Sequence, residues 1–303
     1  MIITPEILNG LRESRGIDIA DCRSVCLMMG PYRNLTTLTA ATLFLHPNCQ
    51  VLNHGKDRVF GIEEVDFLSD FSIERFNRFI QYAIYISRSG KRGWYGGTIT
   101  VSHAFDSQYA TSELFHQSGL ELVKKKIVCL LWKESLEISN KIKLSQFDFH
   151  AVFKKENRIR FMMPIRNPLD CAASSIKTGH SKHFLNIQRS DVLEDVLQAV
   201  LEEILWFKTL HSQFPNRFYY FFEHTISKST CNDLANFLEL SLQEDWINRA
   251  LQGFTCSSNY QYFPSQLDFF IDSVKKKFID YPRFADQLLI FADLTQKRGF
   301  LQE

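Results

Sequence analysis

The stretch VCLMMGPYRNLTTLTAATLFL, residues 25–45, joins a short apolar segment, a turn and a segment of helical character. Residues 25–29 are all apolar, which is typical of a strand buried on both faces of a parallel sheet. Gly30 and Pro31 end that strand, and we expect a helix from about residue 36 to residue 45. A strand, a turn and a helix in this order predict a βα unit of an α/β fold.

The start of this helix is suited to binding an oxyanion. Several backbone N–H groups in the first turn of a helix lack partners, and the helix dipole is positive there. Thr36 and Thr37 add hydroxyl donors, and Arg33 adds a permanent charge with a forked set of donors. By itself the segment predicts only an anion-binding helix start, and an ordinary helix N-cap would have the same pattern.

A second strand leads into a helix at Arg166. Residues 159–165 (IRFMMPI) read as a buried strand, and Asn167 and Pro168 suit the N-cap and the first position of a helix. Capping does not explain Arg166, whose charge at the end of an apolar strand needs a partner. Ser174 follows in the same helix, so an arginine and a serine hydroxyl predict a second anion site.

The rest of the chain repeats the alternation of strands and helices. We expect further strands at residues 98–101, 127–132 and 217–222, and helices at residues 65–87, 191–210 and 229–240. The alternation predicts one three-layer α/β domain over residues 1–303, with a central, mostly parallel sheet.

Composition narrows the class of protein. A net charge of +1 gives no reason to expect a nucleic-acid partner. No apolar stretch approaches the roughly 20 residues of a membrane span, and the N-terminus lacks a signal-peptide pattern. The seven cysteines form no CxxC pair, which favours reduced thiols in a cytoplasmic protein over a zinc site. The two KKK runs, residues 124–126 and 275–277, are expected to be solvated helix faces.

The two anion-site segments resemble the cofactor-binding motifs of sulfotransferases. Residues 30–48, GPYRNLTTLTAATLFLHPN, are similar to the family's 5′-phosphosulfate loop, often written PxSGTT and ended by His-Pro-Asp/Asn. Residues 166–175, RNPLDCAASS, are similar to its 3′-phosphate motif and keep the spacing from Arg166 to Ser174. Leu35 stands where the family has Gly, and is expected to oppose a left-handed backbone and reshape the loop. The family's C-terminal RKG-type loop has no clear match in residues 255–266.

The resemblance implies a P-loop-NTPase-like sulfotransferase fold and an activity. A sulfuryl group would pass in line from 3′-phosphoadenosine-5′-phosphosulfate (PAPS) to a hydroxyl or amine, leaving adenosine 3′,5′-bisphosphate, with no metal required. Residues 55–125 and 245–303 would supply the acceptor site and a lid. The residues implied in binding the cofactor are Pro31, Tyr32, Arg33, Asn34, Leu35, Thr36, Thr37, Leu38, Arg166 and Ser174.

The catalytic residues implied are Arg33, which would stabilise charge on the leaving phosphate, and a base. Three bases stay open. His54 lies at about the offset from Arg33 at which some sulfotransferases, such as the tyrosylprotein type, place a catalytic Glu. His103 ends the strand expected at residues 98–101, and Glu134 follows the strand expected at residues 127–132.

The predicted partner is a small-molecule or carbohydrate acceptor, and the chain could form a homodimer. One alternative is a relative of the family that binds a nucleotide without catalysis. A P-loop kinase is another alternative, although the GxxxxGK[ST] pattern and its lysine are absent from the loop after Met29.

Overall fold

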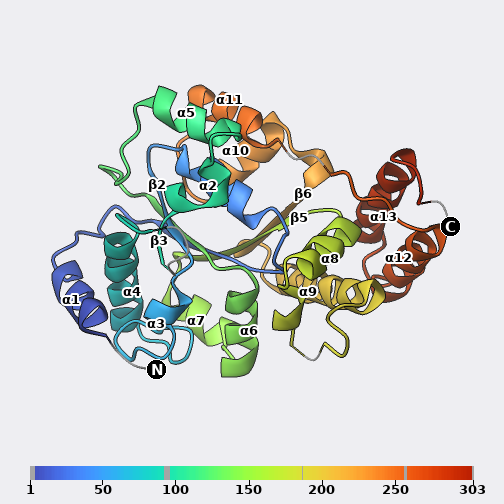
Figure 1. The fold of residues 1–303 in the computed structure, drawn as a ribbon. Helices are drawn as coiled ribbons and strands as arrows, with labels where there is room; N and C mark the ends of the chain where they lie inside the picture. The colour runs from blue at the N-terminus through green and yellow to red at the C-terminus, as the bar shows by residue number, and fades with distance from the viewer. Residues whose placement is uncertain (1–3, 92–95, 186, 256–257, 302–303) are drawn as a thin grey trace. The chain divides into compact units, whose positions relative to one another are not determined.

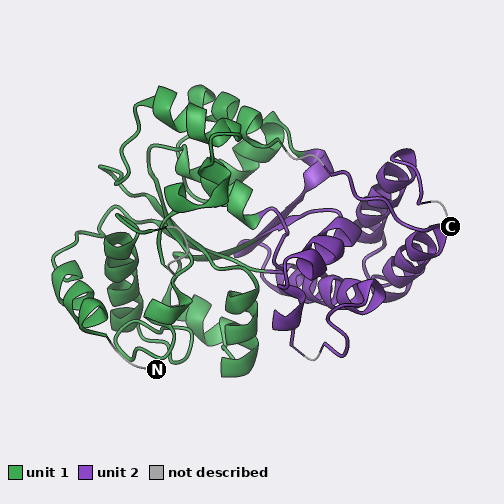
Figure 2. Ribbon diagram, viewed as in Figure 1, with its two compact units in different colours: residues 1–29, 36–162, 226–255 green, residues 30–35, 163–225, 256–303 purple. Residues whose placement is uncertain are grey.

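The structure is a computed structural model that describes residues 4–91, 96–185, 187–255 and 258–301. The predicted acceptor and lid regions, residues 55–125 and 245–303, are described except at these gaps. The chain forms two compact units, shown in Figure 2. Unit 1 comprises residues 1–29, 36–162 and 226–255, and unit 2 comprises residues 30–35, 163–225 and 256–303. The single domain expected from the sequence stays a prediction.

The predicted α/β fold with a mostly parallel central sheet is confirmed. Strand β1 pairs in parallel with β4 and with β5, and β2 pairs in parallel with β4, whereas β3 is antiparallel to β2. The strand order is β3-β2-β4-β1-β5-β6. The strands are β1 (Ser24–Met28), β2 (Cys49–Asn53), β3 (Gly97–Thr98), β4 (Cys129–Lys133), β5 (Ile159–Ile165) and β6 (Phe218–Phe222).

Unit 1 has helices on both faces of its strands. Figure 1 shows α2, α5, α10 and α11 on one side and α1, α4, α6 and α7 on the other. Every residue of β1, β2 and β4 is buried, as a sheet covered on both faces requires. The helices are α1 (Pro5–Ser14), α2 (Thr36–Phe44), α3 (Lys56–Val59), α4 (Ile73–Ile86), α5 (Ala110–Ser118), α6 (Leu136–Ser145), α7 (Phe149–Lys155), α10 (Lys228–Phe237) and α11 (Glu244–Gly253).

Unit 2 is mainly helical and contains β6 and the last residues of β5. Helix α9 packs against α8, α12 and β6, and α12 packs against α13. Its helices are α8 (Pro168–Lys177), α9 (Leu193–Gln213), α12 (Pro264–Lys277) and α13 (Pro282–Lys297). The described residues also form four short 3₁₀ turns. Unit 1 has η1 (Ile99–Val101) and η2 (His103–Phe105), and unit 2 has η3 (Ser181–His183) and η4 (Glu223–Thr225).

Three elements differ from those that the sequence predicted. The helix expected at residues 65–87 begins only at Ile73, because Asp66 accepts hydrogen bonds from the N–H groups of Gly61 and Ser69 and holds that segment in turns. The strand expected at residues 98–101 stops at Thr98, whose hydroxyl starts a 3₁₀ turn instead. Strand β2 was not expected at all.

The expectation for Lys124 was wrong. The segment 124–126 lies in the connection between α5 and β4, and Lys124 is only 5% exposed. Its ammonium lies 4.0 Å from the centroid of the Phe44 ring, and burial lowers its pKa to about 8.

Six cysteines of the described chain are free and buried: Cys22, Cys26, Cys49, Cys129, Cys171 and Cys231. Burial raises the pKa of the Cys22 thiol to about 12, and it raises the pKa of Cys171 to the same value. Thiols in this state are protonated and poor nucleophiles near neutral pH.

None of the helices that the structure describes has the length and apolar character to cross a lipid bilayer.

Candidate functional site

Unit 1 brings two of the three candidate bases into contact. Because β2 and β4 run in parallel with Asn53 paired to Lys133, the residues after them leave the sheet at the same level. There the His54 N–H donates to the Lys133 carbonyl at 2.9 Å. The His54 Nδ1 lies 3.4 Å from the Glu134 carboxylate, and the Lys133 ammonium lies 3.2 Å from His54 Nε2. We call His54, Lys133 and Glu134 the base cluster.

The contacts of the base cluster favour one arrangement of donors and acceptors. An ammonium can only donate, so Nε2 of His54 accepts from Lys133 and Nδ1–H donates to Glu134. Glu134, which is 1% exposed, also accepts from the backbone N–H of Lys56 at 3.1 Å. A buried carboxylate therefore orients an imidazole whose side chain is 32% exposed. This arrangement can position a general base.

The same edge of unit 1 includes the start of α2. The Ser135 N–H donates to the carbonyl of Met28 at the end of β1, and its hydroxyl donates to Thr36 Oγ1 at 2.8 Å. Helix α2 begins at Thr36 and has no acidic residue in its first turn, so its positive end is not neutralised from within. Ser135 thus links Thr36, a predicted cofactor residue, to the strand end that carries Lys133 and Glu134.

His103 is placed apart from these contacts. It is an exposed residue of η2, and its ring lies edge-on to Tyr109 with the centroids 6.5 Å apart. The choice of base stays a prediction, but His54 and Glu134 act on one another whereas His103 belongs to a different turn.

Unit 2 brings together the predicted phosphate-binding residues Arg33, Arg166 and Ser174, which we call the anion cluster. Arg33 Nε donates to Ser174 Oγ at 2.9 Å, and Arg166 Nη1 lies 3.5 Å from the Arg33 carbonyl. Arg166 and Ser174 are 8% and 3% exposed. Guanidinium groups and a hydroxyl are the kinds of donor that a phosphate dianion takes.

The loop that carries Arg33 is held by its neighbours in unit 2. The Asn34 side chain is buried and accepts from the Arg166 N–H at 2.8 Å. The Tyr32 carbonyl accepts from the Cys171 thiol at 3.1 Å and from the Ser175 hydroxyl at 3.4 Å. The loop is therefore fixed to the first turns of α8.

The backbone of this loop differs from the expectation for Leu35. Arg33 and Leu35 both adopt left-handed conformations, with φ of 63° and 59°. Leu35 thus takes the conformation that glycine favours, and it does so while its side chain is buried at 9% exposure. Gly30 has φ of 93°, a backbone conformation that residues with a Cβ rarely adopt, so this position favours glycine.

The His-Pro-Asn segment at the end of α2 has a structural role in unit 1. His46 Nδ1 accepts from the Asn48 N–H at 3.1 Å, and His46 Nε2 lies 3.0 Å from the Ser241 carbonyl. Burial lowers the pKa of His46 to about 4, so the ring is neutral near pH 7. This histidine joins the end of α2 to the segment that precedes α11.

The structure adds polar residues that the sequence did not single out. Asp170, in the first turn of α8, is 2% exposed and is held by Arg298 through two contacts of 2.9 and 3.1 Å. Tyr262 donates to the same carboxylate at 2.8 Å. The sequence signal for Arg298 is the triplet Lys297-Arg298-Gly299, which lies beyond residues 255–266.

The described residues contain no group of three or more His, Cys, Asp or Glu side chains arranged to hold a metal ion.

Neither a comparison with protein-family models nor a search of curated proteins found a match.

Solved structures show a distant likeness. Mouse sulfotransferase SULT7A1 complexed with PAP aligns with a TM-score of 0.45 and 10% identity over 96% of this chain and 94% of that one. Sulfotransferase STF9 from Mycobacterium avium aligns with a TM-score of 0.44 and 12% identity, over 91% and 83%. The sulfotransferase domain of the Synechococcus PCC 7002 olefin synthase aligns with a TM-score of 0.38 and 10% identity, over 75% and 76%.

Proposed function

We propose that this protein is a sulfotransferase that moves the sulfuryl group of PAPS to a hydroxyl or amine of a small-molecule or carbohydrate acceptor. The observation that carries the proposal is the anion cluster, in which Arg33 donates to the buried hydroxyl of Ser174 and the Arg166 guanidinium lies 3.5 Å from the Arg33 carbonyl. These are the residues of the two segments that resemble the family's phosphate-binding motifs.

Arg166 and Ser174 of the anion cluster would hold the 3′-phosphate of the cofactor, and Arg33 belongs to the loop that would meet its 5′-phosphosulfate. Arg166 and Ser174 are positioned by β5 and α8, and Arg33 donates to Ser174, so a phosphate there would replace one hydroxyl contact with several charge-assisted ones. The 5′-phosphosulfate would be met by the N–H groups at the start of α2 and by the hydroxyls of Thr36 and Thr37. PAPS supplies an activated sulfuryl group joined to phosphate through a bridging oxygen.

The base cluster would remove the acceptor's proton. His54 Nε2 takes that proton once the acceptor replaces Lys133 at this nitrogen, and Glu134 holds Nδ1–H in place and stabilises the imidazolium. The acceptor oxygen or nitrogen forms a bond to sulfur as the bond from sulfur to the bridging oxygen breaks. The electron pair of that bond goes to adenosine 3′,5′-bisphosphate, and Lys133 and Arg33 are the cations suited to stabilise the charge.

Calorimetry with adenosine 3′,5′-bisphosphate tests the proposal. We expect micromolar binding, weakened about 10- to 100-fold in Arg166→Ala and in Ser174→Ala, because each removes a charge-assisted contact worth about 1.5–3 kcal/mol. Arg189→Ala is the matched control, since Arg189 is an exposed arginine of unit 2 that pairs with Asp195. Tight binding of ATP-Mg with none of the bisphosphate would instead indicate a kinase or nucleotidase.

A further inference from the structure

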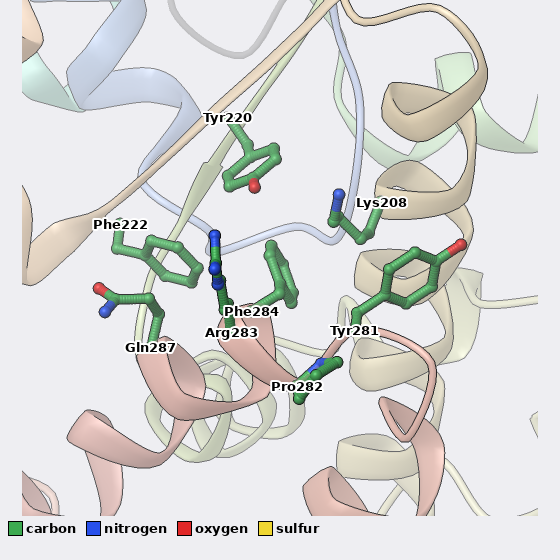
Figure 3. A pocket seen from close by; sticks show the side chains of 8 residues that line it. All are labelled: Lys208, Tyr220, Phe222, Tyr281, Pro282, Arg283, Phe284 and Gln287. Atoms are coloured by element: carbon green, nitrogen blue, oxygen red, sulfur yellow. The ribbon is translucent and has the colours of Figure 1, made fainter.

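Unit 2 contains a cavity of about 330 Å³ that the proposed function does not use. It lies where β6, the later turns of α9 and the start of α13 meet, and Figure 3 shows the side chains around it. Its volume is at the lower end of the range of small-molecule pockets, about 300–1,000 Å³. A ligand of one or two rings would fill it.

Aromatic rings form much of the cavity wall. Tyr220 and Phe222 come from alternate positions of β6, so both side chains lie on one face of that strand. Tyr281 and Phe284 come from the start of α13, and the Phe284 ring lies 5.0 Å from Tyr220 and 5.2 Å from Phe222. Walls of this kind favour a flat, apolar ligand body.

The charged residues of the cavity wall are both cations. The Lys208 ammonium lies 5.0 Å from the centroid of Tyr281, 5.8 Å from Tyr220 and 5.9 Å from Phe284, and it donates to the Ser212 hydroxyl. Lys208 is half-buried, and burial lowers its pKa. Arg283 lines the same cavity, and within the described chain neither cation has a carboxylate within 4.0 Å.

Ring stacking stabilises the Lys208 charge only in part. Cation–π contacts contribute about 0.5–2 kcal/mol, less than a paired and hydrogen-bonded anion provides at a desolvated cation. An anionic group between Lys208 and Arg283 would complete the site, while the attached ring would pack against the aromatic wall. A cationic ligand would be repelled by both residues.

From this cavity we infer that unit 2 binds a small planar aromatic anion, one or two fused rings bearing a carboxylate or sulfate, between Lys208, Arg283 and the rings of Tyr220, Tyr281 and Phe284. The site is separate from the residues assigned to the nucleotide and to the base. It could hold an aromatic ligand that modulates the protein or an aromatic sulfate that the proposed reaction produces, and both share this chemistry.

Three probes with the same ring and different charge test this site by calorimetry on the full chain: 2-naphthoate, 2-naphthamide and 2-naphthylmethylammonium. We expect 2-naphthoate to bind one to one with a Kd below 1 mM, and the neutral amide to bind at least 10-fold more weakly. No binding is expected for the ammonium probe. Equal binding of all three would overturn the inference, because the cavity would then select only for apolar surface.

Two variants test whether 2-naphthoate binds in the cavity. Lys208→Met keeps most of the side-chain volume, and Arg283→Gln changes an exposed residue. Each should weaken 2-naphthoate at least 10-fold, whereas Lys275→Met, at an exposed lysine of α12, should leave the Kd unchanged. If both cavity variants bind 2-naphthoate like the unaltered protein, the inference is wrong.

A competition experiment separates this inference from the proposed function. Saturating adenosine 3′,5′-bisphosphate should leave the Kd of 2-naphthoate unchanged, and Arg166→Ala should leave it unchanged as well. Displacement by the bisphosphate would show that 2-naphthoate occupies the anion cluster, which would overturn the inference. Binding of 2-naphthoate without any binding of the bisphosphate would support the cavity site while contradicting the sulfotransferase proposal. An arm with 2-naphthyl sulfate tests the product as the source of the ligand and should give a Kd within 10-fold of that of 2-naphthoate.

Discussion

Four non-glycine residues in or next to the base cluster and the anion cluster have a positive φ. Arg33 and Leu35 precede α2, His54 follows β2, and Ser135 follows β4, and all four have φ near 60°. A non-glycine residue in this region costs about 1–2 kcal/mol, so it persists only where surrounding contacts fix it. At His54 and Ser135 those contacts are the hydrogen bonds to Lys133, Met28 and Thr36. The conformations of His54 and Ser135 turn the chain directly after β2 and β4, where candidate site residues lie.

The contact between His54 and Glu134 gives a prediction for turnover. His54→Ala removes the base, and Glu134→Gln removes the charge that stabilises the imidazolium, so each should lower the turnover of PAPS by about 10²- to 10⁴-fold. Bisphosphate affinity, measured by calorimetry, should stay unchanged in both variants. His103→Ala is the comparison, since His103 lies in η2, and it should retain turnover. Full turnover by His54→Ala would show that His54 is not the base and would leave Glu134 and His103 as the candidates.

Lys124 gives a prediction for pH dependence. Its pKa is about 8 in the folded protein, against 10.5 for an ordinary lysine, so the unfolded chain binds more protons between these values. This residue therefore makes stability rise as pH increases from 8 to 10.5, by up to about 3 kcal/mol. Below pH 8 the charge is present in both states and its burial destabilises the fold by the full amount. Lys124→Met should thus be more stable than the unaltered protein by about 1–3 kcal/mol at pH 7, with the difference shrinking above pH 8.

Urea unfolding at pH 7, 8, 9 and 10 measures that difference. Lys125→Met is the control, because Lys125 is exposed and pairs with Glu121 at the surface. Its effect should stay within about 0.5 kcal/mol at every pH. A stability difference for Lys124→Met that does not change with pH would contradict the assignment of a buried, poorly solvated ammonium.

At the scale of elements, α8 depends on contacts made by the end of α13. Arg298 follows α13 and reaches the buried Asp170 in the first turn of α8, and Asn167, the N-cap of α8, donates to Thr295 at 2.8 Å. Because α8 also carries Ser174, these contacts support the helix that positions the hydroxyl of the anion cluster.

Removal of Arg298 should destabilise the protein through Asp170. Arg298→Met leaves a carboxylate that is 2% exposed with Tyr262 as its remaining partner, and we expect a loss of about 3–5 kcal/mol in the free energy of unfolding. In the double variant Arg298→Met with Asp170→Asn, the loss should be at least about 1 kcal/mol smaller than the sum of the two single losses. Arg189→Met, at an exposed ion pair, should cost less than about 1 kcal/mol in the same urea experiments. Additive losses in the double variant would show that Arg298 stabilises α8 by other means.

The sequence predicted the elements that have a simple pattern. Strand β5 has the predicted bounds, and Asn167 and Pro168 occupy the predicted N-cap and first position of α8. Strand β2 was missed because Gln50 and Asn53 interrupt its apolar run. In the structure, Gln50 is fully buried and satisfied by Ser87, Leu122 and Lys124. Partners 37 to 74 residues away cannot be read from a local pattern.

The same limit applies to the candidate site. Arg33, Arg166 and Ser174 were found because they follow strands in motif-like segments. The pairing of His54 with Glu134 depends on the parallel register of β2 and β4, and β2 was not predicted. Likewise, the left-handed conformation of Leu35 depends on tertiary contacts that override the residue's own preference.

At the scale of the whole molecule, the chain passes repeatedly between the two units. Each unit is built from three separate segments, and β5 begins in unit 1 and ends in unit 2. Residues 30–35 of unit 2 are joined at both ends to β1 and α2 of unit 1. Neither unit can therefore complete its fold from one continuous stretch of chain.

This connectivity predicts a single cooperative unfolding transition. Trp132 and Trp246 are buried in unit 1, and Trp206 belongs to α9 of unit 2. The urea midpoint from the fluorescence of a Trp94→Phe, Trp206→Phe double variant, which reports Trp132 and Trp246 of unit 1, should coincide with its midpoint from far-UV circular dichroism, which reports both units. Two separate midpoints would show that the units unfold independently and would contradict the single domain predicted from the sequence.

The buried free cysteines have a practical consequence for following such transitions. Five of them, Cys22, Cys26, Cys49, Cys129 and Cys231, lie in unit 1, and Cys171 lies in unit 2. A thiol-modifying reagent can reach each sulfur only when the surrounding structure opens. The rate of modification therefore measures how often the structure around each thiol opens. In a Cys256→Ser background, mass spectrometry of the modified peptides would time the opening of each unit separately, with probes that the natural sequence already carries.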